Sequence, residues 1–152
     1  VAHLKDQPSN VLIDGVFELR YLENRGSAFG MMQNKLMILI PVTVVVTLLI
    51  LYLFFKKLPA TRHFFWLNAV AVLFFAGAIG NFIDRVRQGY VVDFFYFSLI
   101  NFPIFNVADI YVTVAAFLLI FLCLFYYKEE DFEQIFPSDS SRQHSSEKKD
   151  ND

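Results

Sequence analysis

Three long apolar runs divide the chain, and each is close to the length that a helix needs to cross a membrane. The runs cover residues 36–55, 64–83 and 104–127, and the first two contain no charged residue. A transmembrane helix needs about 20 mostly apolar residues, whereas a buried helix of a soluble protein is shorter and keeps a polar face. The pattern predicts an all-α integral membrane protein with a transmembrane helix at each of these three positions.

A shorter, alternating pattern precedes the first run. Residues 11–22 carry alternating apolar and polar side chains from Val16 onward, after the dipeptide Asp14-Gly15. Such alternation is typical of a half-buried strand, and Asp-Gly is typical of a hairpin turn. We therefore expect residues 1–35 to form an extracytoplasmic segment that contains a small pair of strands.

The short connector at residues 56–63 sets the expected orientation. It contains two lysines, an arginine and a histidine, and basic loops between spans face the cytoplasm. Residues 1–35 and 84–103 would then face outward. The tail at residues 128–152 holds eight acidic and four basic residues, a balance of −4, with several serines. This composition predicts a disordered cytoplasmic tail.

Composition supports a membrane protein and excludes several functions. Hydrophobic residues make up 56% of the 152 residues and aromatic residues 18%, which is too apolar for an ordinary soluble domain. Outside the apolar runs there is no basic stripe, so a nucleic-acid partner is not expected. The single cysteine, Cys123, lies deep in an apolar run, and no Cys/His cluster offers a metal site. We predict no metal and no cofactor.

Two carboxylates, Asp93 and Asp109, lie at the rims of the apolar runs and are the main candidates for chemistry. Charged groups at membrane depth are costly, so an acidic residue there is a functional candidate by default. If the fold brings the two together, one proton becomes shared between them, which is the ground state of an aspartic protease.

Other interpretations of these residues stay open at this level. Asp109 could be an ordinary carboxylate at a helix start, and Asp93 a turn residue. The three asparagines nearby could be helix caps and turn formers, and the aromatic residues of 94–105 either an interfacial belt or a lid. The pair could also bind cations or relay protons in a small transporter or channel subunit, which predicts ion-dependent function without proteolysis. In a structural membrane subunit, Asp→Asn changes would be tolerated.

Three sequence blocks carry a resemblance to a known family. They are Asn24-Arg-Gly-Ser-Ala-Phe-Gly30, the segment from Gly80-Asn-Phe-Ile-Asp-Arg85 to Gly89-Tyr-Val-Val-Asp-Phe94, and Phe105-Asn-Val-Ala-Asp109. In this order, and with apolar runs between them, the blocks resemble the lipoprotein signal peptidase (signal peptidase II) family of bacterial membrane aspartic proteases. The resemblance extends from about residue 13 to about residue 127.

The resemblance implies a specific activity and site. It implies an endopeptidase that cleaves a prolipoprotein just before its diacylglyceryl-modified cysteine, without a cofactor. The enzyme would be a monomer among the lipids of the bacterial cytoplasmic membrane, with its active site near the extracytoplasmic face. Asp93 and Asp109 would be the catalytic pair. The supporting or substrate-binding residues would be Asn24, Gly26, Asn81, Asp84, Arg85 and Asn106.

Two departures from the family pattern accompany the resemblance. Ser27 stands where the family usually has alanine, a change of one hydroxyl. The family also begins with a further membrane helix that ends near an Asp-Gln motif, and residues 5–7 do not match it because no apolar helix precedes them. We expect that the intact family has four transmembrane helices and that the first of them would lie before Val1.

Overall fold

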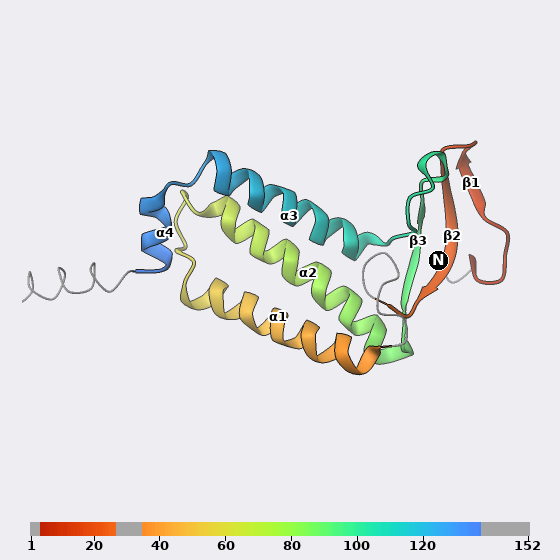
Figure 1. Cartoon of the computed structure of the whole chain (residues 1–152), viewed down its shortest axis with the longest axis horizontal. Coiled ribbons are helices and arrows are strands. Elements are labelled where there is room, and N and C mark those ends of the chain that lie inside the picture. The colour runs from red at the N-terminus through yellow and green to blue at the C-terminus, as the bar shows by residue number, and fades with distance from the viewer. Residues whose placement is uncertain (1–3, 27–34, 138–152) are drawn as a thin grey trace, which may run out of the picture.

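The molecule consists of a layer of three long helices with a small sheet at one end and a short helix at the other (Figure 1). This computed structural model describes residues 4–26 and 35–137. Helix α2 lies between α1 and α3, and it packs against both of them. The elements, in chain order, are β1 (Asn10–Ile13), β2 (Phe17–Asn24), α1 (Leu36–Lys56), α2 (Phe65–Gln88), β3 (Val91–Tyr96), the 3-10 helix η3 (Ser98–Ile100), α3 (Val107–Phe125) and α4 (Glu129–Ile135).

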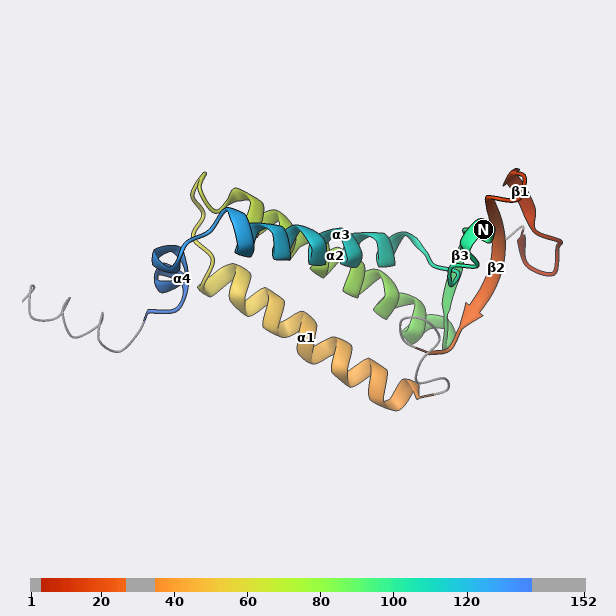
Figure 2. The ribbon, with the colours of Figure 1, turned by 45° about the horizontal axis from the view of Figure 1, so that its top comes forward.

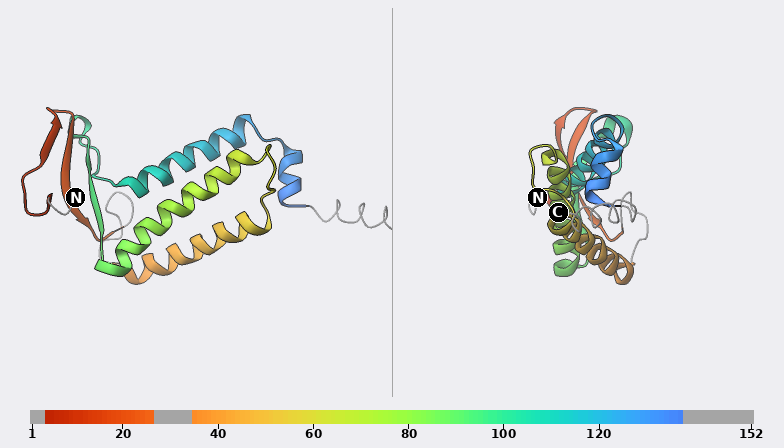
Figure 3. Two further views of the ribbon diagram at one scale, coloured as in Figure 1. Left: turned by 180° about the vertical axis from the view of Figure 1, so that it is seen from behind. Right: turned by 90° about the vertical axis from the view of Figure 1, so that its left-hand side faces the viewer.

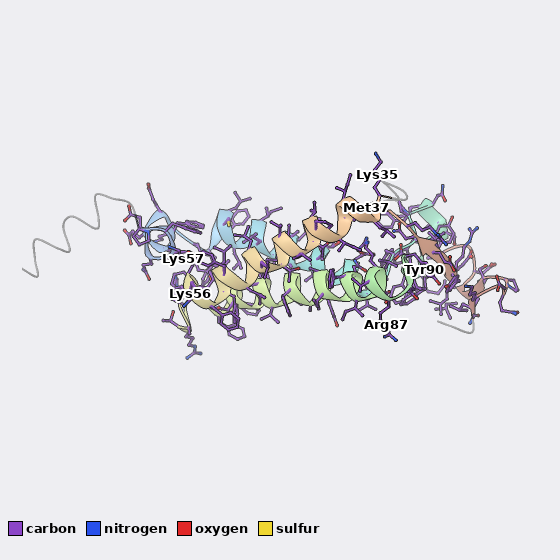
Figure 4. The ribbon with its side chains drawn as sticks, turned by 90° about the horizontal axis from the view of Figure 1, so that it is seen from below. Lys35, Met37, Lys56, Lys57, Arg87 and Tyr90 are labelled. Carbon is purple, nitrogen blue, oxygen red and sulfur yellow. The ribbon has the colours of Figure 1, made fainter. Side chains whose placement is uncertain are left out.

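The three long helices confirm the predicted fold class. Each is long and apolar enough to cross a membrane, and at most 22% of the residues in any of these spans are buried inside the protein. Because so little of this apolar surface is covered by protein, most of it is suited to contact with lipid. Figure 4 shows Lys56 and Lys57 at the α4 end of the bundle and Lys35 and Arg87 at the sheet end, so charged side chains flank an apolar zone.

Two helix boundaries differ from the predicted ranges by three residues or more, and both differences shape the polar end of the bundle. Helix α2 runs five residues beyond the predicted end at residue 83, as far as Gln88. It ends there because Gly89 adopts a left-handed conformation (φ 81°), and its N–H donates to the carbonyl oxygen of Arg85. Helix α3 begins at Val107, later than the predicted residue 104, because Asn106 caps it.

Helices α2 and α3 approach each other closely at two glycines. A Cβ atom on Gly77 would lie 2.6 Å from the carbonyl oxygen of Ala108 and 2.6 Å from a methyl group of Val112. At Gly80, a Cβ atom would lie 3.3 Å from the Cβ of Ala108. The missing side chains therefore let the two backbones come together at the first turns of α3.

The sheet contains three antiparallel strands in the order β1-β2-β3 and lies across the ends of the helices (Figures 1 and 2). The strands β1 and β2 form the predicted hairpin, with Gly15 at φ 64° in its turn. The third strand, β3, was not predicted from the sequence. It pairs Asp93 with Leu22 and Val91 with Asn24, so Asp93 lies in a strand and not in a turn.

The start of the C-terminal tail also differs from the prediction. Residues predicted to be disordered form the helix α4, in which the N–H of Lys128 donates to Asp131 in a capping arrangement. The helix buries Ile135 to 3% exposure in a core cluster with Phe64 and Tyr127, at the end of the bundle farthest from the sheet (Figure 3). Packing of this apolar face orders a segment that is otherwise highly charged. Residues 138–152 lie outside the described residues.

Candidate active site

Asp93 is a buried carboxylate in the middle of β3. Its exposed fraction is 1%, the lowest of any charged residue in the described part of the chain. Strand alternation directs Val91 and Asp93 to one face of the sheet and Val92 and Phe94 to the other. Both carboxylate oxygens accept hydrogen bonds from asparagine side chains, Oδ1 from Asn106 at 2.7 Å and Oδ2 from Asn24 at 2.8 Å.

Asp109 occupies the first turn of α3. Asn106 is the N-cap of this helix, and its Oδ1 accepts from the backbone N–H groups of Ala108 and Asp109 at 2.7 and 3.2 Å. In return, the N–H of Asn106 donates to Oδ2 of Asp109 at 3.1 Å. This reciprocal capping box fixes the Asp109 carboxylate beside Asn106.

Two asparagines join the carboxylates into one network. The Nδ2 of Asn106 donates both to Asp93 and to Oδ1 of Asn81, the second at 3.1 Å. Asn81 in turn donates from Nδ2 to Oδ1 of Asp109 at 2.9 Å. A continuous path of side-chain hydrogen bonds therefore runs from Asp93 through Asn106 and Asn81 to Asp109. In Asn106, both amide hydrogens and the amide oxygen are engaged, so the orientation of its amide is determined.

Arg85 ties this network to the segment that follows β2. Its guanidinium donates to the carbonyl oxygen of Asn81 at 3.2 Å and to that of Gly26 at 2.9 Å. The N–H of Gly26 donates to Oδ1 of Asn24 at 2.9 Å, which orients the amide that contacts Asp93. Gly26, just after β2, and the last turns of α2 therefore hold the same cluster.

These side chains line a pocket with a volume of about 330 Å³ between β3, α2 and α3. The carboxylates, the three asparagines and Arg85 form its polar part, and most of the remaining wall is apolar. The apolar residues come from β3, from the segment before α3 and from the first turns of that helix. The lining includes Val91, Phe102, Pro103, Ile104, Phe105, Ile110, Val112 and Val114. A pocket with an apolar wall and a few convergent polar groups is the usual form of a ligand site.

Burial changes the electrostatics of Asp93. Removal from water raises the pKa of this carboxyl to about 6, and the negative charge of Asp109 acts in the same direction. The hydrogen bonds from Asn106 and Asn24 and the charge of Arg85 lower the pKa and offset part of the rise. Asp109 lies at the positive end of the α3 helix dipole, which favours a negative charge. The two carboxylates therefore have different environments.

The structure brings most of the sequence-predicted site residues together. Gly26 contributes only backbone groups, and Asp84 lines a different pocket, with Lys5 and Tyr90. Ser27 lies outside the described residues.

Sequence reasoning missed Thr113, which lines the pocket one helical turn after Asp109. A spacing of four residues on a helix is a signal that could have found it. Residues 4–26 and 35–137 contain no group of three or more His, Cys, Asp or Glu residues that could hold a metal ion.

Comparison with known proteins gives a consistent result at the level of sequence. The family model described as signal peptidase (SPase) II matches residues 1–125. The chain is 47% identical over 115 residues to the lipoprotein signal peptidase of Caldanaerobacter subterraneus subsp. tengcongensis. The aligned segment covers 75% of this chain and 75% of that protein. The chain is 42% identical over 118 residues to the lipoprotein signal peptidase of Streptococcus pneumoniae, covering 78% and 73%.

Solved structures agree with the sequence comparisons. One bacterial membrane enzyme, solved by the in meso method at 2.3 Å resolution, superposes with a TM-score of 0.72 at 32% identity, over 80% of this chain and 76% of that chain. A second, solved at 1.9 Å resolution, gives a TM-score of 0.66 at 34% identity, over 79% and 77%. The arrangement of helices and sheet is therefore shared with membrane enzymes whose sequences are also related.

Proposed function

Because the chain belongs to the signal peptidase II family, whose members are membrane proteases, we propose that it removes signal peptides from lipid-modified prolipoproteins with Asp93 and Asp109. The bond cleaved would be the one just before the diacylglyceryl-modified cysteine. The observation that carries this proposal is the hydrogen-bond path that joins the two carboxylates through Asn106 and Asn81 inside one pocket.

The chemistry needs one ionised and one neutral carboxyl group. Asp109, at the positive end of α3, takes a proton from a water molecule, whose oxygen then attacks the carbonyl carbon of the scissile bond. Asp93 gives its proton to the carbonyl oxygen, which produces a tetrahedral diol. The diol collapses when Asp93 recovers a proton from a hydroxyl and Asp109 gives its proton to the departing nitrogen. The raised pKa of Asp93, about 6, supports its assignment as the carboxyl that carries the proton in the active form.

The asparagines have a positioning role in this proposal. Each oxygen of the two carboxylates accepts one amide N–H, from Asn24, Asn81 or the two donors of Asn106. Such donors hold the carboxylates in place but cannot take up a proton at neutral pH. Proton transfer is thereby confined to Asp93, Asp109, water and the substrate.

The location of the pocket supports a substrate that arrives within the membrane. The pocket lies where the apolar α3 meets the sheet, at the end of the bundle opposite the connector that holds Lys56 and Lys57. With that basic connector in the cytoplasm, the pocket faces the extracytoplasmic side of the bacterial membrane. A lipid anchor in the outer leaflet would place the adjoining peptide bond at this level. The carboxylates, the asparagines and the arginine all belong to this chain, so the proposed chemistry needs no residue from a second subunit.

The decisive experiment is cleavage of a diacylglyceryl-modified prolipoprotein by the full-length protein in vesicles. We expect Asp93→Asn and Asp109→Asn each to lower the rate by roughly 10²–10⁴-fold or more, the usual contribution of a general acid or base. Asp14→Asn, in the exposed β1–β2 turn, is the matched control and should cleave normally. Comparable cleavage by either active-site variant would disprove the assignment. A folded protein that never cleaves, but conducts cations or protons, would favour a transporter.

A further inference from the structure

The segment between β3 and α3 presents apolar side chains that protein does not cover. Leu99 and Ile100, in η3, are each 68% exposed, although they belong to the most hydrophobic residue types. The segment extends sideways at the end of α3, on the side away from α1, as Figure 1 shows by the green loop that follows β3. We define residues 97–102 as the lip.

The base of the lip is fixed by the backbone and by aromatic packing. The N–H of Phe102 donates to the carbonyl oxygen of Phe97 at 3.1 Å, which closes the lip. Below this closure, Phe95 and Phe105 exchange backbone hydrogen bonds of 2.9 and 3.1 Å. The ring of Phe97 stacks on that of Phe105 with a centroid distance of 5.9 Å. This backbone closure and aromatic packing fix the base of the lip against the sheet.

The tip also has a local constraint. Asn101 adopts φ 47°, in the left-handed region, and its Oδ1 accepts a 2.7 Å hydrogen bond from the hydroxyl of Tyr96. Asparagine tolerates this region better than most residues, and the side-chain hydrogen bond adds a local constraint. Leu99 and Ile100 are therefore exposed in a segment whose neighbouring residues make defined backbone and side-chain contacts.

Along the chain, no charged residue separates the lip from the membrane span that follows it. The residues from 94 to 108 include no Asp, Glu, Lys, Arg or His, so no ionisable cation or carboxylate separates β3 from α3. At the start of α3, Val107, Tyr111 and Val114 are 41%, 41% and 48% exposed in a helix that is long and apolar enough to cross a membrane. Apolar surface of this extent outside a bilayer would be unusual for a protein surface.

We propose that the lip inserts into the phospholipid leaflet nearest the sheet, beside the mouth of the pocket. Its occupant is bilayer lipid, because no charged residue separates the lip from the membrane span α3 and the lip carries no charge that would keep it in water. Phe102 lines the pocket and also belongs to the lip, so the inserted segment forms part of the pocket wall. The lip would therefore fix the height of Asp93 relative to the lipid headgroups.

The β1–β2 hairpin is the natural contrast. Its strand β1 exposes Val11, Leu12 and Ile13, but the turn that follows β1 carries the charged Asp14. Insertion of the hairpin would bury charged groups in lipid, which is costly. A label at Asp14 should consequently report an aqueous position.

The test is a depth measurement that does not depend on proteolysis. In a Cys123→Ala background, Leu99→Cys, Ile100→Cys and Asp14→Cys would each receive a spin label, and the full chain would be reconstituted into vesicles of phosphatidylcholine and phosphatidylglycerol. We expect accessibility to oxygen relative to a water-soluble nickel chelate to be several-fold higher at residues 99 and 100 than at residue 14. Two labelled positions are used because either substitution alone could disturb the fold, which circular dichroism would reveal.

Two results would overturn the proposal. Accessibility to the nickel chelate at residues 99 and 100 equal to that at residue 14 would place the lip in water. Low accessibility to both reagents would mean that protein, and not lipid, covers the tip. Neither result bears on catalysis by Asp93 and Asp109, so failure of this proposal is distinguishable from failure of the proposed function.

Discussion

The side-chain amide of Asn106 donates a 2.7 Å hydrogen bond to Oδ1 of Asp93, and this contact joins the start of α3 to the middle of β3. The same amide oxygen caps α3 through the N–H groups of Ala108 and Asp109. One residue therefore orients a carboxylate on a strand and a carboxylate on a helix at once. The geometry of the candidate site depends on Asn106 more than on any other uncharged residue.

Substitution of Asn106 by aspartate should be more harmful than substitution by alanine. Alanine removes a hydrogen bond to a charged or ionisable group, which costs about 1.5–3 kcal/mol. Aspartate adds a third carboxylate that faces Asp93 and repels it. We expect the catalytic rate to fall roughly 10- to 100-fold for Asn106→Ala, by the usual conversion of barrier height to rate, and further for Asn106→Asp.

The measurement is kcat for cleavage at matched protein folding, with Asn10→Ala, in the exposed strand β1, as control for loss of an asparagine outside the site. Equal rates for Asn106→Asp and the unaltered protein would contradict the role assigned to the amide.

The raised pKa of Asp93 predicts how stability changes with pH. The folded pKa, about 6, lies above the ordinary value of 3.8, so folding favours the protonated form. This contribution is fully present below about pH 4, decreases as pH rises toward 6, and is absent above that. The rise of about two units in the pKa of Asp93 corresponds to about 3 kcal/mol in the free energy of unfolding. Unfolding in detergent at pH 4 to 7 should show this loss, and Asp93→Asn should remove it. A stability profile identical in the two proteins would rule out the raised pKa.

A methyl group at Gly77 should separate α2 from α3. Its Cβ would lie 2.6 Å from a backbone oxygen and 2.6 Å from a side-chain carbon of α3, so the helices must shift. Overpacking of this kind typically costs about 1–3 kcal/mol, and it should also displace Asn81 from Asp109. The expected result for Gly77→Ala is a lower melting temperature together with lower activity.

Gly80→Ala is the matched control, because its Cβ would meet only the Cβ of Ala108 at 3.3 Å. If Gly80→Ala proved as damaging as Gly77→Ala, the close approach at Gly77 would not be the cause.

The short helix α4 should detach in acid. Nε2 of His63 lies 2.8 Å from Oδ1 of Asp131, and the N–H of Lys128 donates to Oδ2 of the same carboxylate. The hydrogen bond from the Lys128 N–H, followed by the interaction with His63, holds the pKa of Asp131 below its usual value of 3.8. The stability from this group is therefore present above pH 3.8 and is lost as pH falls through the lowered pKa.

Hydrogen exchange at residues 129–135 would measure the detachment of α4. These residues should lose protection in acid before the long helices do. Asp131→Ala should show faster exchange there already at neutral pH, whereas Glu133→Ala, on the same helix, should not. Loss of protection in both variants would indicate that helix propensity, and not the Asp131 contacts, keeps α4 folded.

The long helices and the β1–β2 hairpin could be predicted because their signals are local. A run of about 20 apolar residues can satisfy its backbone within a bilayer only as a helix, and Asp14-Gly15 marks its own turn. The strand β3 lacked such a signal. Val91–Tyr96 pairs with β2, about 70 residues earlier in the chain, and a strand that depends on a distant partner is hard to recognise from its own residues.

The family blocks identify the asparagines of the site, but the residues alone do not predict how these side chains are connected. Asn81 and Asn106 contact each other across 25 positions in the chain, and only the close approach of α2 and α3 at Gly77 makes that contact. The sequence did not predict that α4 is folded, for a related reason. Its charged composition favours disorder, and the burial of Ile135 against Phe64 and Tyr127 is a tertiary effect.

Helix α2 passes into β3 through only Gly89 and Tyr90, so Asn81 and Asp93 are carried on two nearly continuous rigid elements. A helix that crosses a bilayer adjusts its tilt when the hydrocarbon layer becomes thinner or thicker. We expect such a tilt of α2 to move the strand that bears Asp93. Under the proposed function, membrane thickness, and with it the acyl-chain length of the host lipids, would then affect the alignment of the two carboxylates and the rate of cleavage.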